Sequence, residues 1–223
     1  QEDGAIMKVA IVAITKKGQS AAFRIKKNIA GSKIYVLSLK GGLRDLAKKL
    51  FSKFEGIVFF MAAGIVVRVI APYINNKYTD PAVVVVDDEG RFAISLLSGH
   101  EGGANNLAIR VANSLGAEPV ITTASESRRN LILGIGCRRG IEKIEIVKAV
   151  RYALAKSGYP IDRIRYIATI DLKQNEQGLQ DACTELGIPL RIISVDLVKK
   201  FSGTYERSSF VKEKIGVEGV SEP

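Results

Sequence analysis

Short, uninterrupted runs of apolar and largely β-branched residues recur along this chain, and they constrain its fold more than any other feature. The run at 8–14 reads Lys-Val-Ala-Ile-Val-Ala-Ile, and similar runs occupy 57–60 and 82–86. Strands of a parallel sheet are covered on both faces, so they are apolar throughout instead of at every second residue. These runs therefore predict buried strands of a mostly parallel sheet.

Segments with helical spacing separate the runs. Between residues 18 and 30, Ala22, Ile25 and Ile29 fall on one face of a helix. The same reasoning predicts helices at 43–54, 65–70, 103–115, 141–156 and 175–186, and strands at 34–37, 92–96, 119–123, 131–134, 166–170 and 190–193. Strands 82–86 and 92–96 flank an acidic turn that is typical of a hairpin tip. The alternation predicts an α/β fold.

The segment 124–130 is polar and lacks either periodicity, so it is the expected domain boundary. We expect two α/β domains, 7–125 and 130–223, each a mostly parallel sheet with flanking helices. A chain of 223 residues is long enough to give both a hydrophobic core.

Charge and composition narrow the function classes. The formal charge of +10 is divided +6 and +4 between residues 1–125 and 126–223, with no block of five like charges. Aromatic residues make up 7% and do not interleave with Lys or Arg, so nucleic-acid binding is not expected.

The longest apolar run, 57–67, has 11 residues, whereas a membrane span needs about 20. No secretory signal is visible, and Cys137 and Cys183 lack metal-ligand spacing. We therefore expect a cytoplasmic protein with free thiols and without a membrane segment.

Residues 95–106 form the segment richest in chemical groups, Ser-Leu-Leu-Ser-Gly-His-Glu-Gly-Gly-Ala-Asn-Asn. They join a predicted strand to a predicted helix, which we expect at the carboxyl end of the sheet, where open α/β folds bind ligands. His100 is the single histidine of the chain, and a helix N-terminus favours the neutral imidazole that a general base needs. The alternative is a tight turn in which Ser98 or Asn105 caps the helix.

Two further segments carry basic side chains near predicted strand ends. Gly64 opens another strand-to-helix turn, and Arg68 follows in an otherwise apolar segment, where it either pairs with a carboxylate or binds substrate. Lys77 and Asp80 precede the strand at 82–86 and are equally compatible with an ordinary loop.

Residues 134–140 read Gly-Ile-Gly-Cys-Arg-Arg-Gly between a strand and a helix. Arg139 replaces the third glycine of a dinucleotide fingerprint, and the acidic residue expected about 20 positions later is missing. Arg138 and Arg139 fit a carboxylate or phosphate clamp better, and Lys173 follows the next strand. Cys137 fits a packed thiol better than a nucleophile.

Taken together, these motifs resemble the cobalt-precorrin 5A hydrolase family of anaerobic cobalamin biosynthesis. The amino-terminal part of that family is similar to Ala-Gly-Ile-Val-Val-Arg at 63–68, to 80–87 and to 95–105. Its carboxy-terminal domain is similar to 134–140, to Asp-Leu-Lys at 171–173 and to 216–223. Members usually carry a middle segment before the Gly-Ile-Gly-Cys motif and continue past Val-Ser-Glu-Pro, so either this chain is a shortened member or segments of the protein are missing from it.

The resemblance implies that a δ-lactone on a cobalt-containing corrinoid is hydrolysed and that acetaldehyde is then lost, giving cobalt-precorrin 5B. The cobalt arrives inside this anionic substrate, so we expect neither a cofactor nor a protein metal site. From residue chemistry, His100 is the expected base or proton shuttle, with Glu101 beside it. The expected substrate-binding residues are Gly64, Arg68, Lys77, Ser98, Gly99, Gly102, Gly103, Asn105, Arg138, Arg139 and Lys173.

One alternative stays open beside this reading, namely a non-catalytic partner that binds and delivers a tetrapyrrole or corrinoid within the pathway. It would use the same basic clamps, but His100 would be dispensable. Nucleic-acid binding and a nucleotide-binding transferase built on 134–140 are less well supported by the sequence. The oligomeric state is not fixed by it.

Overall fold

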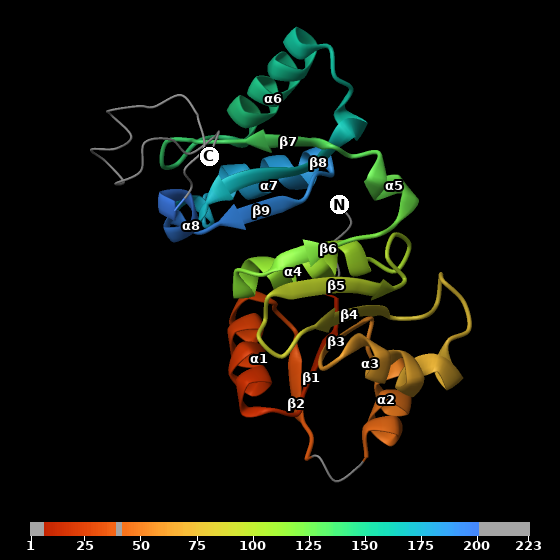
Figure 1. Cartoon of the computed structure of the whole chain (residues 1–223). Coiled ribbons are helices and arrows are strands. Elements are labelled where there is room, and N and C mark those ends of the chain that lie inside the picture. Colours follow the sequence, from red (N-terminus) through yellow and green to blue (C-terminus); the bar gives the residue numbers. More distant parts are fainter. Residues whose placement is uncertain (1–6, 39–41, 201–223) are drawn as a thin grey trace. The chain divides into compact units, whose positions relative to one another are not determined.

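The computed structural model describes residues 7–38 and 42–200 (Figure 1). They form two compact units that divide between Thr123 and Ala124. Each unit has its own sheet and its own helices, which confirms the predicted α/β fold class. Among the described residues, none of the helices has both the length and the apolar character that a membrane crossing requires.

Unit 1 contains a six-stranded sheet with the order β2-β1-β3-β4-β5-β6. Its elements are β1 (Val9–Ala13), α1 (Lys16–Asn28), β2 (Lys33–Val36), α2 (Leu43–Phe51), β3 (Gly56–Phe60), α3 (Ala63–Ile70), the 3-10 turn η1 (Ala71–Tyr73), β4 (Ala82–Val86), β5 (Phe92–Leu97), α4 (Ala104–Leu115) and β6 (Glu118–Val120). The predicted strand at 119–123 is thus shorter and ends at Val120.

The two faces of the unit 1 sheet are both covered. Alternate residues of β1 point to opposite faces, so Ile11 packs with α1 and α4 while Val12 packs with α2 and α3. All five residues of β1, β3 and β4 are buried. Burial on both faces explains why these strands have uninterrupted apolar sequences.

Strand β5 runs against the direction of its neighbours, and this reversal relocates a predicted site. β2, β1, β3 and β4 are mutually parallel, whereas β5 pairs with β4 in antiparallel fashion through the hairpin. The end of β5 therefore lies at the edge where β1, β3 and β4 begin, which we call the amino edge. The expectation that residues 95–106 lie at the carboxyl end of the parallel strands was wrong.

The tip of the β4–β5 hairpin is held by Asp87. Its carboxylate accepts hydrogen bonds from the backbone N–H groups of Arg91 and Phe92, at 2.7 and 2.8 Å, and from the Arg91 guanidinium at 2.9 Å. Desolvation alone would raise the pKa of Asp87, but these hydrogen bonds outweigh it and lower the pKa below its ordinary value. Ionised Asp87 therefore stabilises the folded hairpin.

We expect Asp87→Ala to lower the free energy of unfolding by about 1–2 kcal/mol at neutral pH, because two backbone donors and Arg91 lose their acceptor. The folded-state pKa is depressed, so this contribution is present above the unfolded-state pKa of about 3.9 and fades as the pH falls through the folded value. Urea unfolding at pH 7 and at pH 3 measures it. A wild-type advantage that persists undiminished at pH 3 would contradict the assignment.

Unit 2 contains a three-stranded parallel sheet with the order β7-β8-β9. Its elements are α5 (Ala124–Ser127), β7 (Leu131–Gly134), α6 (Lys143–Ser157), η2 (Ile161–Arg163), β8 (Ile164–Ile170), η3 (Asp171–Lys173), α7 (Gln177–Leu186), β9 (Leu190–Ile193) and α8 (Val195–Lys200). α6 and α7 pack together over one core with Ile164 and Ile167 of β8. The sequence did not predict α5 or α8, and the motif at 216–223 lies outside the described residues.

Candidate functional site

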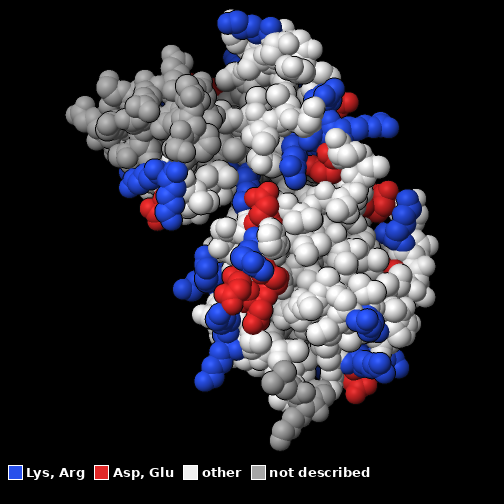
Figure 2. All heavy atoms as spheres, viewed as in Figure 1, with Lys and Arg blue, Asp and Glu red and all other residues white. Residues whose placement is uncertain are grey.

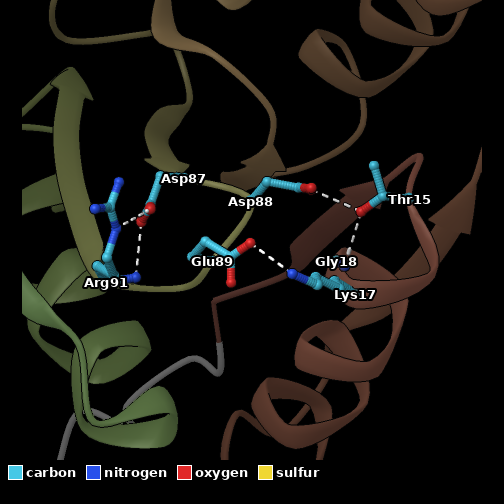
Figure 3. Close-up of polar contacts among 7 residues, drawn as sticks. All are labelled: Thr15, Lys17, Gly18, Asp87, Asp88, Glu89 and Arg91. Atoms are coloured by element: carbon cyan, nitrogen blue, oxygen red, sulfur yellow. Dashed lines mark hydrogen bonds and ion pairs between the residues drawn. The ribbon is translucent and has the colours of Figure 1, made fainter.

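The opposite edge of the unit 1 sheet, where β1, β3 and β4 end, is the carboxyl edge. The tip of the β4–β5 hairpin lies there. Asp88 accepts a hydrogen bond from the Thr15 hydroxyl at 2.6 Å, and Glu89 accepts one from Lys17 Nζ at 2.6 Å (Figure 3). Thr15 also caps α1, because its hydroxyl oxygen accepts the Gly18 N–H at 3.0 Å. Ligands of open α/β sheets bind at this edge, and anions favour helix N-termini. Here the chain's own carboxylates lie beside the first turn of α1.

Gly64 and Arg68 also follow a strand that ends at the carboxyl edge. The Arg68 guanidinium donates to the carbonyl oxygen of Gly64 at 3.1 Å, one turn back in α3. Five-residue strands such as β3 span about 17 Å, so this pair and the segment after β5 lie at opposite ends of the sheet. The structure does not bring Gly64 and Arg68 together with His100.

The loop between β5 and α4, residues 98–103, forms a closed turn at the amino edge. The carbonyl oxygens of Ser98 and Gly99 accept the N–H groups of Ala104 and Asn105, at 3.1 and 2.9 Å. The Asn105 side chain accepts a hydrogen bond from the Ser95 hydroxyl at 2.8 Å and donates one to Thr123 at 3.1 Å. Asn105 therefore fastens the loop to the sheet, a role that sequence reasoning did not assign to it.

The interior of this loop is too crowded for a side chain at Gly102. A Cβ there would lie 2.5 Å from Ser98 Cβ and 3.0 Å from the Ser98 carbonyl oxygen. Within the described chain, the backbone N–H groups of residues 99–103 have no hydrogen-bond acceptor. Where successive backbone N–H groups of a turn point to the same side, they form a concavity that favours an anionic oxygen. The nest at Gly102 and Gly103 stays a prediction, and the structure leaves its amide N–H groups without a described acceptor.

Two titratable side chains of the loop, His100 and Glu101, lie in a row with Lys77 from the segment before β4. Glu101 places one oxygen 3.8 Å from His100 Nδ1 and the other 3.8 Å from Lys77 Nζ. The three side chains are 42%, 66% and 63% exposed, so solvent and a ligand can reach them. Lys77 also lies 4.6 Å from the centre of the Tyr78 ring. Lys77, predicted as a loop residue or a substrate clamp, is a neighbour of the His100 and Glu101 pair.

Asp80 orders the segment that carries Lys77. It is 8% exposed, and its carboxylate accepts the N–H groups of Asn75 and Asn76 at 2.9 and 3.0 Å. Its backbone carbonyl lies 3.4 Å from the position of a Cβ on Gly102. The sequence signal was an aspartate directly before Pro81 at a strand start, which is typical of a turn.

In unit 2, the predicted glycine turn and Lys173 meet through Glu176. Glu176 accepts the Gly140 N–H at 2.8 Å and lies 3.3 Å from Lys173 Nζ. The backbone hydrogen bond from Gly140 is the main cause that lowers the pKa of Glu176, with Lys173 and Arg139 adding to it. Lys173 is therefore already paired, and sequence reasoning did not single out Glu176 as its partner.

The two adjacent arginines of this turn have different surroundings. Arg138 forms two hydrogen bonds with Glu145, at 2.8 and 3.1 Å, and Glu145 belongs to the capping box of α6. Arg139 forms no ion pair with a described residue. Burial raises the pKa of the nearby Cys137 thiol, although Lys173 opposes the shift, so this thiol is a poor nucleophile at neutral pH.

Charge is mixed over the surface that Figure 2 shows. Lys and Arg side chains are scattered there with Asp and Glu among them, so that face has no continuous basic area. In the described ranges, no three His, Cys, Asp or Glu side chains gather closely enough to hold a metal ion.

Comparisons with known proteins agree with the motifs. The model of the family described as cobalamin synthesis G N-terminal matches residues 45–126, and that described as cobalamin synthesis G C-terminus matches 131–223. The two matches join an amino-terminal and a carboxy-terminal module of one kind of cobalamin-pathway protein. The chain belongs to the cobalamin synthesis G family.

Three curated relatives show how much of such a protein this chain represents. It is 42% identical over 136 residues to the cobalt-precorrin-5A hydrolase of Priestia megaterium and 52% identical over 86 residues to that of Salmonella typhimurium. These matches include 55% and 39% of this chain but only 36% and 24% of the relatives. The chain thus matches well under half the length of either bacterial protein.

An archaeal relative aligns over nearly the whole chain. It is the protein of Methanocaldococcus jannaschii named "Probable cobalt-precorrin-5A hydrolase", 25% identical over 290 residues, with 97% of this chain and 88% of the relative covered. The alignment is longer than the 223 residues of this chain, so the relative has residues without a counterpart here.

Proposed function

We propose that this chain hydrolyses the δ-lactone of cobalt-precorrin 5A and releases acetaldehyde, giving cobalt-precorrin 5B in anaerobic cobalamin biosynthesis. The observation that carries the proposal is the contact of Lys77 with Glu101 and of Glu101 with His100, in a loop whose amides at 99–103 have no described acceptor. The family membership and the names of the relatives supply the substrate class. The cobalt enters as part of that substrate.

His100 is the base in this reaction. Glu101 lies on the Nδ1 side of the ring, which favours a proton on Nδ1 and leaves Nε2 free to accept a proton from water. Lys77 holds the Glu101 carboxylate from its other oxygen. The water oxygen adds to the lactone carbonyl, the ring C–O bond breaks, and the alkoxide takes up a proton to give an alcohol beside a carboxylate.

Loss of the two-carbon fragment follows from that alcohol. Its O–H proton leaves as the neighbouring carbon–carbon bond breaks, so acetaldehyde departs and the electron pair stays on the macrocycle, which is then protonated. The amides of residues 99–103 stabilise the negative oxygen that develops in the first step, because they are fixed donors that need no rearrangement.

Of the two adjacent arginines in the turn at 134–140, Arg139 is the one that forms no ion pair with a described residue, which leaves it available for a substrate carboxylate. We expect Arg139→Ala to raise the dissociation constant of the corrinoid about 3- to 10-fold, and Arg138→Ala to change it less than about twofold, because Arg138 already binds Glu145. Absorbance titration of the corrinoid at fixed moderate salt measures both constants. Equal losses in the two variants would contradict the distinction.

A carrier that binds the corrinoid without converting it is the second candidate, since the same clamps would serve it. Incubation of the chain with cobalt-precorrin 5A, followed by an acetaldehyde assay, separates the two functions. A hydrolase releases acetaldehyde in excess over protein, whereas a carrier binds the corrinoid and releases none.

A further inference from the structure

Two features of Ser98 destabilise the folded chain, namely its backbone conformation and its buried hydroxyl without a partner. Its φ of 56° makes it the one non-glycine residue of the described chain in the left-handed region. It is 9% exposed, and its buried hydroxyl has no hydrogen-bond partner. A non-glycine residue with this φ is strained, and a buried hydroxyl without a partner has lost its hydrogen bonds to water without gaining others, so both features destabilise the fold.

Simple replacements would remove these costs. Glycine would adopt the same φ without strain, and alanine would eliminate the unsatisfied hydroxyl. A serine at this position is thus not explained by folding, and residues that break local rules in this way concentrate at functional sites.

The place of the Ser98 side chain indicates what it does. Its Cβ lies against Gly102, inside the loop whose amides from residue 99 to 103 lack acceptors. The hydroxyl is therefore a further hydrogen-bond donor within the same group of donors. Rotation about χ1 moves the hydroxyl relative to the loop without moving the backbone. His100 belongs to this loop, and Lys77 brings a positive charge to within 3.8 Å of Glu101, the next residue of the loop.

We propose that the Ser98 hydroxyl donates a hydrogen bond to the oxygen anion that forms at the lactone carbonyl, together with the loop amides. This inference rests on the proposed hydrolase function. No bond to Ser98 forms or breaks, because the hydroxyl keeps its proton and only shares it with the anion. The substrate class it selects is an ester or lactone whose carbonyl oxygen becomes negative.

Binding measurements test the donor without requiring turnover. In a His100→Ala background, we compare binding of cobalt-precorrin 5A with binding of the ring-opened product, which carries a carboxylate where the lactone carbonyl stood. Ser98→Ala and Ser98→Gly should weaken product binding about 10-fold and leave lactone binding unchanged. Product affinity equal to that of the parent protein would overturn the inference, as would equal loss for both ligands.

Turnover and stability complete the test. In the otherwise native chain, both variants should lower kcat about 10²-fold with KM unchanged, while their thermal unfolding midpoints stay level or rise. Ser114→Ala is the matched control, because Ser114 is equally buried at 8% but bonds to Arg110 within α4. Absence of acetaldehyde from the native chain would refute the proposed function alone, whereas native-like kcat in both Ser98 variants would refute the donor role alone.

Discussion

Replacing His100 with alanine is expected to lower lactone-opening turnover by about 10²-fold or more, while the corrinoid still binds. The reason is that His100 is the general base of the proposed site, with Glu101 3.8 Å from Nδ1. Alanine removes the proton acceptor but leaves the amides of the 98–103 loop in place. The measurement is single-turnover acetaldehyde release, with binding followed separately by absorbance.

Two further variants make this experiment specific. His100→Gln keeps a hydrogen-bonding side chain of similar size but cannot exchange protons at neutral pH, so it should be as slow as His100→Ala. Lys48→Ala, on an exposed position of α2, should keep native turnover. Turnover of His100→Ala within threefold of the native chain would show that His100 is not the base.

Replacing Gly178 with alanine is expected to have the largest effect on stability, a loss of about 3 kcal/mol or more in the unfolding free energy of unit 2. Gly178 lies in the first turn of α7, and an added Cβ would overlap the carbonyl oxygen of Ile141 and lie 3.1 Å from the Lys143 N atom. Both neighbours are backbone atoms at the start of α6, so no side-chain rotation relieves the overlap.

Hydrogen exchange of the β8 amides measures this loss, because β8 packs in one core with α6 and α7. Thr184→Ala is the control on the same helix, since Thr184 is exposed and its hydroxyl bonds only within α7. It should change stability by no more than about 0.5 kcal/mol. Native protection of β8 in Gly178→Ala would show that α7 can move away from α6 at little cost.

Local patterns in the sequence predicted most elements of both sheets. The uninterrupted apolar runs at β1 and β4 are buried on both faces, and the helical spacing of Ala22 and Ile25 matches the buried side of α1. These elements were predictable because the burial pattern of a strand or helix is written in neighbouring residues. Short elements such as α8 have too few residues for a pattern.

The arrangement of the site depended on pairings between distant segments. The sequence predicted the hairpin but not the strand order. That order is needed to see that β5 ends at the amino edge, so that His100 and Arg68 lie at opposite ends of the sheet. Likewise, Arg138 pairs with Glu145 of α6, and Lys173 pairs with Glu176, the residue before α7. The spacing of Lys173 and Glu176 at i,i+3 was a signal that could have indicated the second pair.

The stored cost at Ser98 also could not be found in the sequence. In the sequence, Ser98 is also compatible with a cap of the following helix. Only its φ angle and its hydroxyl without a partner, both seen in the structure, distinguish it from such a cap. The sequence thus showed which residue types could act in a site. Whether each side chain is free to bind a ligand depended on hydrogen bonds between segments that are distant in the sequence.

The central claim is that this chain opens the lactone with the amino-edge site of unit 1. It is tested most directly by the acetaldehyde released per protein molecule with cobalt-precorrin 5A in excess, measured for the native chain and for His100→Ala side by side. The account predicts many equivalents from the native chain and at least about 100-fold slower release from the variant. Equal release from both, or none from a native chain that binds the corrinoid, would contradict it.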